Sequence, residues 1–223
     1  KSVKIFINLG LPKTASTNLK INFYPNINGL NYMGRILNGP NQKIWVSLNN
    51  YVEFRDEKFF DNKQNLDQLT SDFINFCKKS KKNILISNEN WMIPYQKNNT
   101  SNSHEVVSQW KKLNRLNKFI SSLNIDFKYF IVYRDPKDAL LSSYSTMQHR
   151  IVEIFGIDYV DFNVLLKSIA NKDKNFEEIR LFFDIYNLNK IKESLPKDSL
   201  KVFYYNDLVN HPKTFGYSLF KIL

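Results

Sequence analysis

The sequence is poor in the residues that build covalent and metal-based frameworks. Its 223 residues contain one cysteine, Cys77, and three histidines. A single cysteine excludes an internal disulfide and any zinc site built from several cysteines. Three histidines leave few candidate ligands for a metal centre. We therefore expect a site that requires no metal.

Long hydrophobic runs are also missing. No apolar stretch approaches the length that spans a membrane, and no charged segment followed by an apolar one opens the chain as a secretion signal would. We expect a cytoplasmic protein with no membrane segment in this chain. Because residue 1 lies just before the first expected strand, an upstream anchor or signal could have been removed. The sequence leaves the oligomeric state unknown.

Negative charge is in short supply, with 21 acidic residues against 32 lysines and arginines and a net charge of +11. This balance suits a polyanionic partner, a nucleic acid or an anionic cofactor, although a general abundance of lysine gives the same figure. No basic block is long enough to form a tail, and no helix-turn-helix or zinc-finger pattern is present. We expect no nucleic-acid partner.

What the chain does contain is a regular alternation of apolar segments. Its length is typical of one domain with one sizeable core, so we treat residues 1–223 as a single domain. The expected strands cover residues 3–9, 84–86, 127–133 and 200–205, and the main expected helices cover residues 66–77, 106–123, 136 onward and 176–195. Residues 25–62 are interpreted as an irregular excursion. The alternation predicts an α/β fold in which helices flank a parallel sheet on both faces.

The first expected strand leads into a turn that suits an anion. Gly10 and Pro12 interrupt the apolar run, and residues 14–20 resume as a helix. Such a turn leaves backbone N–H groups unpaired at a helix N-terminus, where the helix dipole also favours negative charge. Lys13 adds a positive charge, and three hydroxyl groups follow it: Thr14, Ser16 and Thr17. The pattern predicts a cradle for a phosphate or sulfate group.

This turn differs from the common nucleoside-triphosphate loop, G-x-x-x-x-G-K-S/T. That loop has a second glycine directly before its lysine, whereas Gly10 is followed by Leu11, Pro12 and Lys13. An ordinary strand-to-helix turn is the alternative interpretation. The decision requires a second site at the same edge of the sheet, where parallel strands bring their carboxyl ends together.

A second candidate anion site follows the strand at residues 127–133. Arg134 stands at the end of this strand, and Ser142 lies eight residues on, in the helix that Asp135 and Pro136 begin. An arginine fork with a hydroxyl suits one phosphate group. Pairing of Arg134 with Asp135 or Asp138 is the alternative. Four side chains follow expected strands and should converge at one edge: Lys13, Glu89, Arg134 and Tyr205.

The two motifs together resemble those of a known enzyme family. Residues 10–17 (GLPKTAST) and 133–144 (YRDPKDALLSSY) are similar to the motifs of sulfotransferases that use 3′-phosphoadenosine 5′-phosphosulfate (PAPS). Residues 204–208 (YYNDL), followed by His211 and Pro212, are similar to that family's late strand-turn element. The resemblance implies a P-loop NTPase-like sulfotransferase fold. It also implies in-line transfer of a sulfuryl group to a hydroxyl or amine of a small molecule, saccharide or lipid.

The resemblance assigns roles to the residues that match. It implies that the loop holds the 5′-phosphosulfate, that Arg134 and Ser142 hold the 3′-phosphate, and that Tyr205 belongs to the cofactor site. The loop residues concerned are Pro12, Lys13, Thr14, Ala15, Ser16 and Thr17. Lys13 would stabilise the charge that develops as the bond between phosphate and sulfate breaks. Ser142 and Lys13 are thus expected in the catalytic set.

The attacking hydroxyl needs a base, and family members place a histidine or glutamate after a central strand. Glu89 follows the strand at residues 84–86 and fits that position, so we assign it as the general base. A glutamate that caps the next turn, or that pairs with a lysine, is the alternative. His104 and His149 are rival bases.

Two features depart from the family's pattern. Nothing after Asp207 matches the glycine- and basic-rich loop that closes over the nucleotide, so the chain is either shortened at its C-terminus or minimal. Tryptophans of the family often stack on adenine, and Trp45 and Trp91 are candidates here, but no motif places either of them. Other functions stay open: a nucleotide or small-molecule kinase with a degenerate phosphate loop, needing magnesium held by an aspartate such as Asp135, and a catalytically silent nucleotide-binding module.

Overall fold

The sheet at the centre of the molecule is wholly parallel. The computed structural model describes residues 2–34, 42–53, 63–93, 107–155, 161–171 and 184–223, with the backbone alone for residues 146–155 and Ile169. The strands are β1 (Ile5–Asn8), β2 (Leu30–Gly34), β3 (Asn83–Ser87), β4 (Phe127–Tyr133) and β5 (Leu200–Tyr204). They pair in the order β2-β3-β1-β4-β5. The predicted parallel α/β fold is therefore confirmed.

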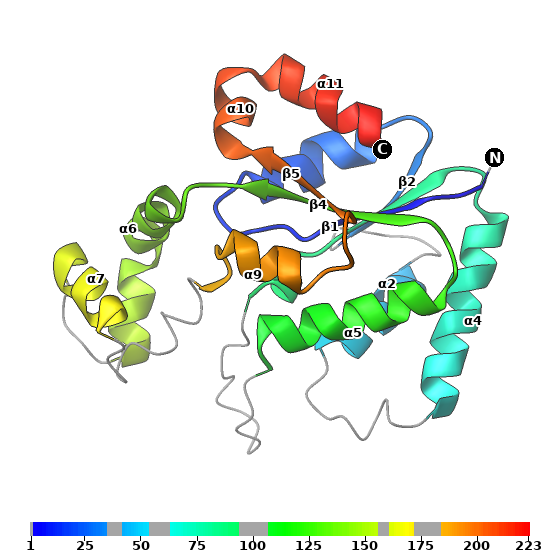
Figure 1. Cartoon of the computed structure of the whole chain (residues 1–223), viewed down its shortest axis with the longest axis horizontal. Coiled ribbons are helices and arrows are strands. Elements are labelled where there is room, and N and C mark those ends of the chain that lie inside the picture. The colour runs from blue at the N-terminus through cyan, green and yellow to red at the C-terminus, as the bar shows by residue number, and fades with distance from the viewer. Residues whose placement is uncertain (1, 35–41, 54–62, 94–106, 156–160, 172–183) are drawn as a thin grey trace.

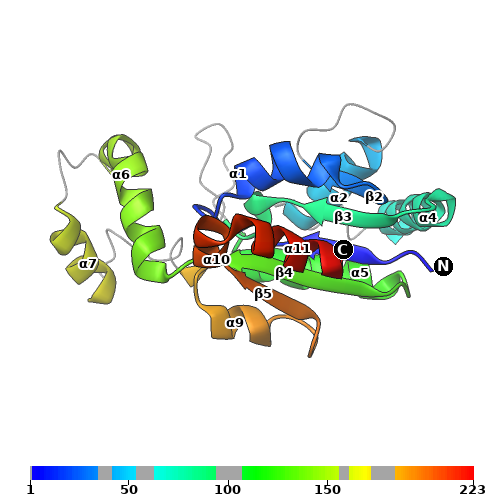
Figure 2. The ribbon, with the colours of Figure 1, turned by 90° about the horizontal axis from the view of Figure 1, so that it is seen from above.

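Helices cover both faces of this sheet, as Figures 1 and 2 show. One face carries α2 (Gln42–Glu53), α4 (Lys63–Lys79), α5 (Gln109–Ser122) and α9 (Leu188–Glu193). The other carries α1 (Ser16–Asn18), the π-helix η1 (Leu19–Phe23), the 3-10 helix η2 (Tyr24–Asn26), α10 (Tyr205–Asn210) and α11 (Pro212–Ile222). Beyond the carboxyl ends of the strands lie α6 (Pro136–Phe155) and α7 (Phe162–Ala170). None of the described helices is both long and apolar enough to cross a bilayer.

The hydrophobic core has one layer on each face of the sheet, because successive side chains along each strand point to opposite faces. In β1, Ile5 and Ile7 pack into the layer beneath α2, α5 and α9, whereas Phe6 packs into the layer beneath η1 and α11. All three are at most 3% exposed. Burial on both faces explains why this strand is apolar at consecutive positions.

Two expectations about secondary structure were wrong. Residues 25–62, interpreted as irregular, contain β2 and α2. β2 was missed because it is a five-residue edge strand that contains an asparagine and ends in a glycine. The helix expected over residues 176–195 is interrupted, since Ile185 and Tyr186 form a turn and the Asn187 side chain caps α9 by accepting from the Lys190 N–H. The earlier part of that expected helix, up to residue 183, lies outside the described residues.

Gly34, at the end of β2, lies against the Tyr32 ring. A Cβ built at Gly34 would come within 2.1 Å of Tyr32 Oη, whereas a Cβ at Gly216 in α11 has nothing nearer than 3.9 Å. We expect Gly34→Ala to lower the free energy of unfolding by about 1–3 kcal/mol through overpacking. Gly216→Ala, the matched control in a helix, should raise it by roughly 0.5–1 kcal/mol. Urea denaturation measures both; equal stability of Gly34→Ala and the native chain would contradict this packing.

Candidate anion-binding and catalytic site

The connections between strands make the pair β1 and β3 a switch point of the sheet. After β1 the chain crosses to β2, beyond β3, and after β3 it crosses to β4, beyond β1. Two neighbouring strands thus send their connections in opposite directions. Parallel α/β sheets bind ligands at such a switch point, outside the carboxyl ends of the strands. Here the switch point lies where the β1–α1 loop (residues 9–15) meets the turn that carries Glu89.

The β1–α1 loop has an unusual backbone for its residues. Lys13 and Ala15 both have φ of 58°, and Gly10 has φ of 40°. Non-glycine residues rarely adopt this left-handed region, which costs about 1–2 kcal/mol per residue, and such strain gathers at ligand-binding turns. Left-handed residues within a turn also bring successive N–H groups together into a concave anion-binding surface. The loop conformation therefore suits an anion.

The three hydroxyl groups of the loop motif have different surroundings. The Thr14 hydroxyl is buried and donates to the Leu11 carbonyl at 2.6 Å. Thr17 is exposed. Ser16 is 5% exposed and donates to Glu89 Oε2 at 2.9 Å. The Thr14 hydroxyl thus closes the turn and the Ser16 hydroxyl donates to Glu89, while the binding of an anion by these residues stays a prediction.

Arg134 joins the two sequence motifs. Its Nη1 donates to the Lys13 carbonyl at 3.0 Å, and its guanidinium lies 4.6 Å from the centre of the Tyr205 ring. Asp135, one of the alternative partners, instead accepts from the Lys137 N–H at the start of α6. The carboxyl ends of β1, β4 and β5 thus bring Lys13, Arg134 and Tyr205 together, as the strand positions predicted.

Ser142 lies half-buried in the early part of α6, where its carbonyl accepts from the Ser145 hydroxyl. The next residue, Ser143, is 1% exposed, and its hydroxyl makes no close hydrogen bond to the described residues, although it lies near the Tyr186 hydroxyl. Ser142 and Ser143 thus place two hydroxyl groups on the helix that follows Arg134.

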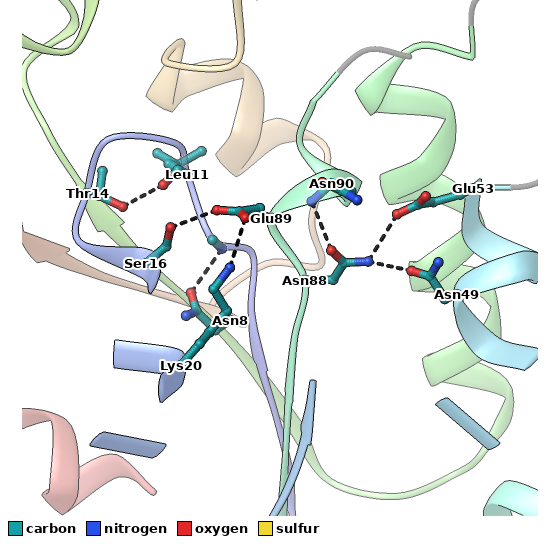
Figure 3. A network of polar contacts seen from close by, with 11 residues as sticks. Asn8, Leu11, Thr14, Ser16, Lys20, Asn49, Glu53, Asn88, Glu89 and Asn90 are labelled. Carbon is teal, nitrogen blue, oxygen red and sulfur yellow. Dashed lines mark hydrogen bonds and ion pairs between the residues drawn. The ribbon is translucent and has the colours of Figure 1, made fainter. Parts of the chain in front are cut away.

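Glu89 is held by the segment that follows the loop (Figure 3). Ser16 and Lys20, four residues apart, both face it: the Ser16 hydroxyl donates to Oε2, and Lys20 Nζ lies 3.0 Å from Oε1. The side chains of Lys20 and Glu89 are 8% and 23% exposed. The Glu89 backbone also approaches Gly10, where a Cβ would lie 3.1 Å from Glu89 Cα. The alternative in which Glu89 pairs with a lysine therefore describes its contacts, while its role as a base stays a prediction.

The turn that carries Glu89 is braced from the opposite face of the sheet. Asn88 donates to Asn49 and to Glu53 of α2, the latter at 3.0 Å, and accepts from the Asn90 N–H (Figure 3). Buried Lys112 of α5 donates to the carbonyls of Asn90 and Ile93 at 2.9 and 2.8 Å. The 3-10 helix η3 (Glu89–Trp91) is therefore fixed relative to both α2 and α5.

Several sequence candidates are not at the site. Trp45 and Trp91 are 7% and 0% exposed, and the centroids of their rings lie 5.7 Å apart. They therefore belong to the core and cannot stack on adenine in this conformation. His104 lies outside the described residues, as does the side chain of His149. Among the residues that are described, no three of His, Cys, Asp and Glu gather as metal ligands would.

Sequence reasoning missed Lys20 and Tyr186. The sequence did contain a signal for Lys20, because a spacing of four residues puts Lys20 and Ser16 on one side of a helix. Tyr186 has none: it follows no strand, and it donates to the Pro12 carbonyl at 2.7 Å from 174 residues away.

Comparison with known proteins supports the fold. No family model and no curated protein matches the sequence. The structure is similar to a sulfotransferase from Alicyclobacillus acidocaldarius, with a TM-score of 0.51 and 12% identity over 96% of this chain and 78% of that one. A sulfotransferase domain from the curacin biosynthetic pathway also matches, with a TM-score of 0.48 and 14% identity over 100% of this chain and 75% of that one. The first likeness shows that the chain has a sulfotransferase-like fold.

Proposed function

We propose that this protein is a sulfotransferase that moves the sulfuryl group of PAPS to a hydroxyl or amine of a small molecule, saccharide or lipid. The observation that carries the proposal is the hydrogen bond from Arg134 to the Lys13 carbonyl, which spans 121 residues. It joins the two candidate anion sites at one sheet edge, and two linked anion sites suit a nucleotide with phosphate at both ends. The sulfotransferase-like fold supports the same function.

The residues present suit the two anionic ends of such a nucleotide. The strained backbone at Lys13 and Ala15, with Ser16 beyond it, would hold the 5′-phosphosulfate. The Arg134 guanidinium would hold the 3′-phosphate together with the hydroxyl of Ser142 on α6. Tyr205, against the Arg134 guanidinium, would keep that side chain in place.

The chemistry divides among three side chains. The bound nucleotide supplies the sulfuryl group and a phosphate leaving group. Lys13 supplies positive charge where negative charge develops, which is how positioning and electrostatics do most of the work in phosphoryl transfer. Glu89 accepts the proton of the acceptor hydroxyl. The Ser16 hydroxyl can donate one hydrogen bond, and it now donates that bond to Glu89 Oε2. If it donated to an incoming oxyanion instead, Oε2 would be released for the acceptor.

Calorimetry with 3′-phosphoadenosine 5′-phosphate (PAP), the product nucleotide, tests the donor. We expect a Kd in the micromolar range, which corresponds to a binding free energy on the order of −8 kcal/mol. Arg134→Ala should weaken PAP binding by about ten- to a hundredfold, since hydrogen bonds to charged groups contribute about 1.5–3 kcal/mol. It should weaken adenosine 5′-monophosphate less, because that nucleotide lacks the 3′-phosphate and loses only the support that Arg134 gives to the Lys13 carbonyl.

ATP with magnesium is the discriminating control. Tighter binding of ATP than of PAP, or magnesium-dependent ATP turnover, would contradict the proposal and favour a kinase. If PAP binds, a panel of phenols, saccharides and lipid alcohols incubated with PAPS identifies the acceptor. Binding without transfer to any member of the panel would indicate a silent nucleotide-binding module.

A further inference from the structure

The β1–α1 loop is also held by a buried residue that the proposed reaction does not use. Tyr186 is 1% exposed, and its hydroxyl donates to the Pro12 carbonyl at 2.7 Å in a buried contact. Burial raises the pKa of Tyr186, so the phenol keeps its proton and remains a donor. Pro12 immediately precedes the left-handed Lys13.

The turn that carries Tyr186 is itself fixed at several points. The Tyr186 carbonyl accepts from the Tyr133 hydroxyl of β4 at 3.1 Å. Two residues earlier, Asp184 accepts from Trp110 of α5 at 3.1 Å and pairs with Lys190 of α9 at 2.7 Å. Tyr186 is thus supported from a strand and two helices on the α5 and α9 face, and its hydroxyl reaches the loop.

A hydrogen bond to the carbonyl of a peptide unit also fixes the direction in which the N–H group of that unit points. Peptide units are planar and trans, so C=O and N–H point in opposite directions. Tyr186 holds the carbonyl of the Pro12–Lys13 unit, and Arg134 holds that of the Lys13–Thr14 unit. These two bonds turn the Lys13 N–H away from Tyr186 and the Thr14 N–H away from Arg134. Two consecutive N–H groups oriented in this way are what a concave anion site needs.

We propose that Tyr186 is a positioning residue for the 5′-anion site: by holding the Pro12 carbonyl it orients the Lys13 N–H toward the 5′-phosphate group of the nucleotide. The inference rests on the proposed function for the identity of the ligand. We expect its effect mainly at the 5′ end, because its hydroxyl donates to the Pro12 carbonyl, whereas Arg134, whose charge the phenol also senses, has contacts of its own with Lys13 and Tyr205.

The test compares two nucleotides that differ in the 5′ group alone. Tyr186→Phe keeps the ring and removes the donor, so the affinity for PAP should fall about tenfold. The affinity for adenosine 3′-monophosphate, which lacks the 5′-phosphate, should stay within about twofold. Tyr133→Phe, which frees the Tyr186 carbonyl from β4, should produce a smaller loss of the same kind. Calorimetry or competition measures these affinities.

Tyr129→Phe is the matched control. It removes another buried tyrosine hydroxyl, which donates to Asn117 Oδ1 at 2.5 Å on the same face of the sheet, and should change thermal stability without changing either affinity. Native affinity of Tyr186→Phe for PAP, or equal losses for both nucleotides, would overturn the role of Tyr186. So would a loss of PAP affinity in Tyr129→Phe as large as that in Tyr186→Phe. Failure of the native chain to bind PAP at all would overturn the proposed function instead.

Discussion

Replacing Lys13 by alanine should slow sulfuryl transfer by about a hundred- to a thousandfold, the usual cost of removing one charge-stabilising group. Lys13 stands in the loop at the carboxyl end of β1, in a left-handed conformation that its neighbours impose. Alanine occupies the same conformation at Ala15, so we expect the loop backbone to survive the substitution. The loss should therefore reflect the missing ammonium group rather than a rearranged loop.

The rate of transfer to an acceptor found in the panel, with PAPS saturating, measures this effect. PAP affinity should fall less, by about ten- to a hundredfold, because the backbone N–H groups remain. Lys4→Ala is the matched control: it removes the same charge from the other end of β1, where Lys4 lies 3.8 Å from Asp126, and should leave the rate unchanged. Turnover of Lys13→Ala within about tenfold of the native rate would remove Lys13 from the catalytic set.

The sheet and the convergence of the two motifs could be predicted because both depend on local patterns. Each buried strand is a short apolar run, and parallel strands must deliver their carboxyl ends to one edge. The positions of Lys13, Arg134 and Tyr205 follow from that rule alone. β2 could not be predicted, because Asn31 interrupts its apolar residues and Gly34 ends it, whereas the apolar residues of β3 are consecutive.

The contacts that orient the site could not be predicted, since they join residues far apart in the chain. Tyr186 reaches Pro12 from a turn that the sequence suggested was helical. Trp45 and Trp91 show the opposite error: large aromatic side chains suit both a stacking site and a core, and composition does not distinguish the two. Their burial and the contact between their rings, whose centroids lie 5.7 Å apart, identify them as core residues.

Glu89→Gln should lower turnover by about a hundredfold or more while leaving PAP affinity nearly intact. The carboxylate now holds two partners, Lys20 at Oε1 and Ser16 at Oε2. Glutamine has the same shape, and it can turn its carbonyl oxygen toward Lys20 and its amide group toward the Ser16 oxygen. The contacts that hold the loop would survive, but an amide cannot take a proton from an acceptor hydroxyl near neutral pH.

Glu53→Gln is the control for this substitution, because it removes the same charge from the other side of Asn88. Glu53 Oε1 lies 3.0 Å from Asn88 Nδ2. It should leave turnover within a few-fold of the native rate. Near-native turnover in Glu89→Gln would move the base to His104, His149 or the substrate itself. A large loss of PAP affinity in Glu89→Gln would have a different meaning. Because Glu89 contacts both Ser16 and Lys20, that loss would identify the carboxylate as a support for the loop, with proton transfer left to another group.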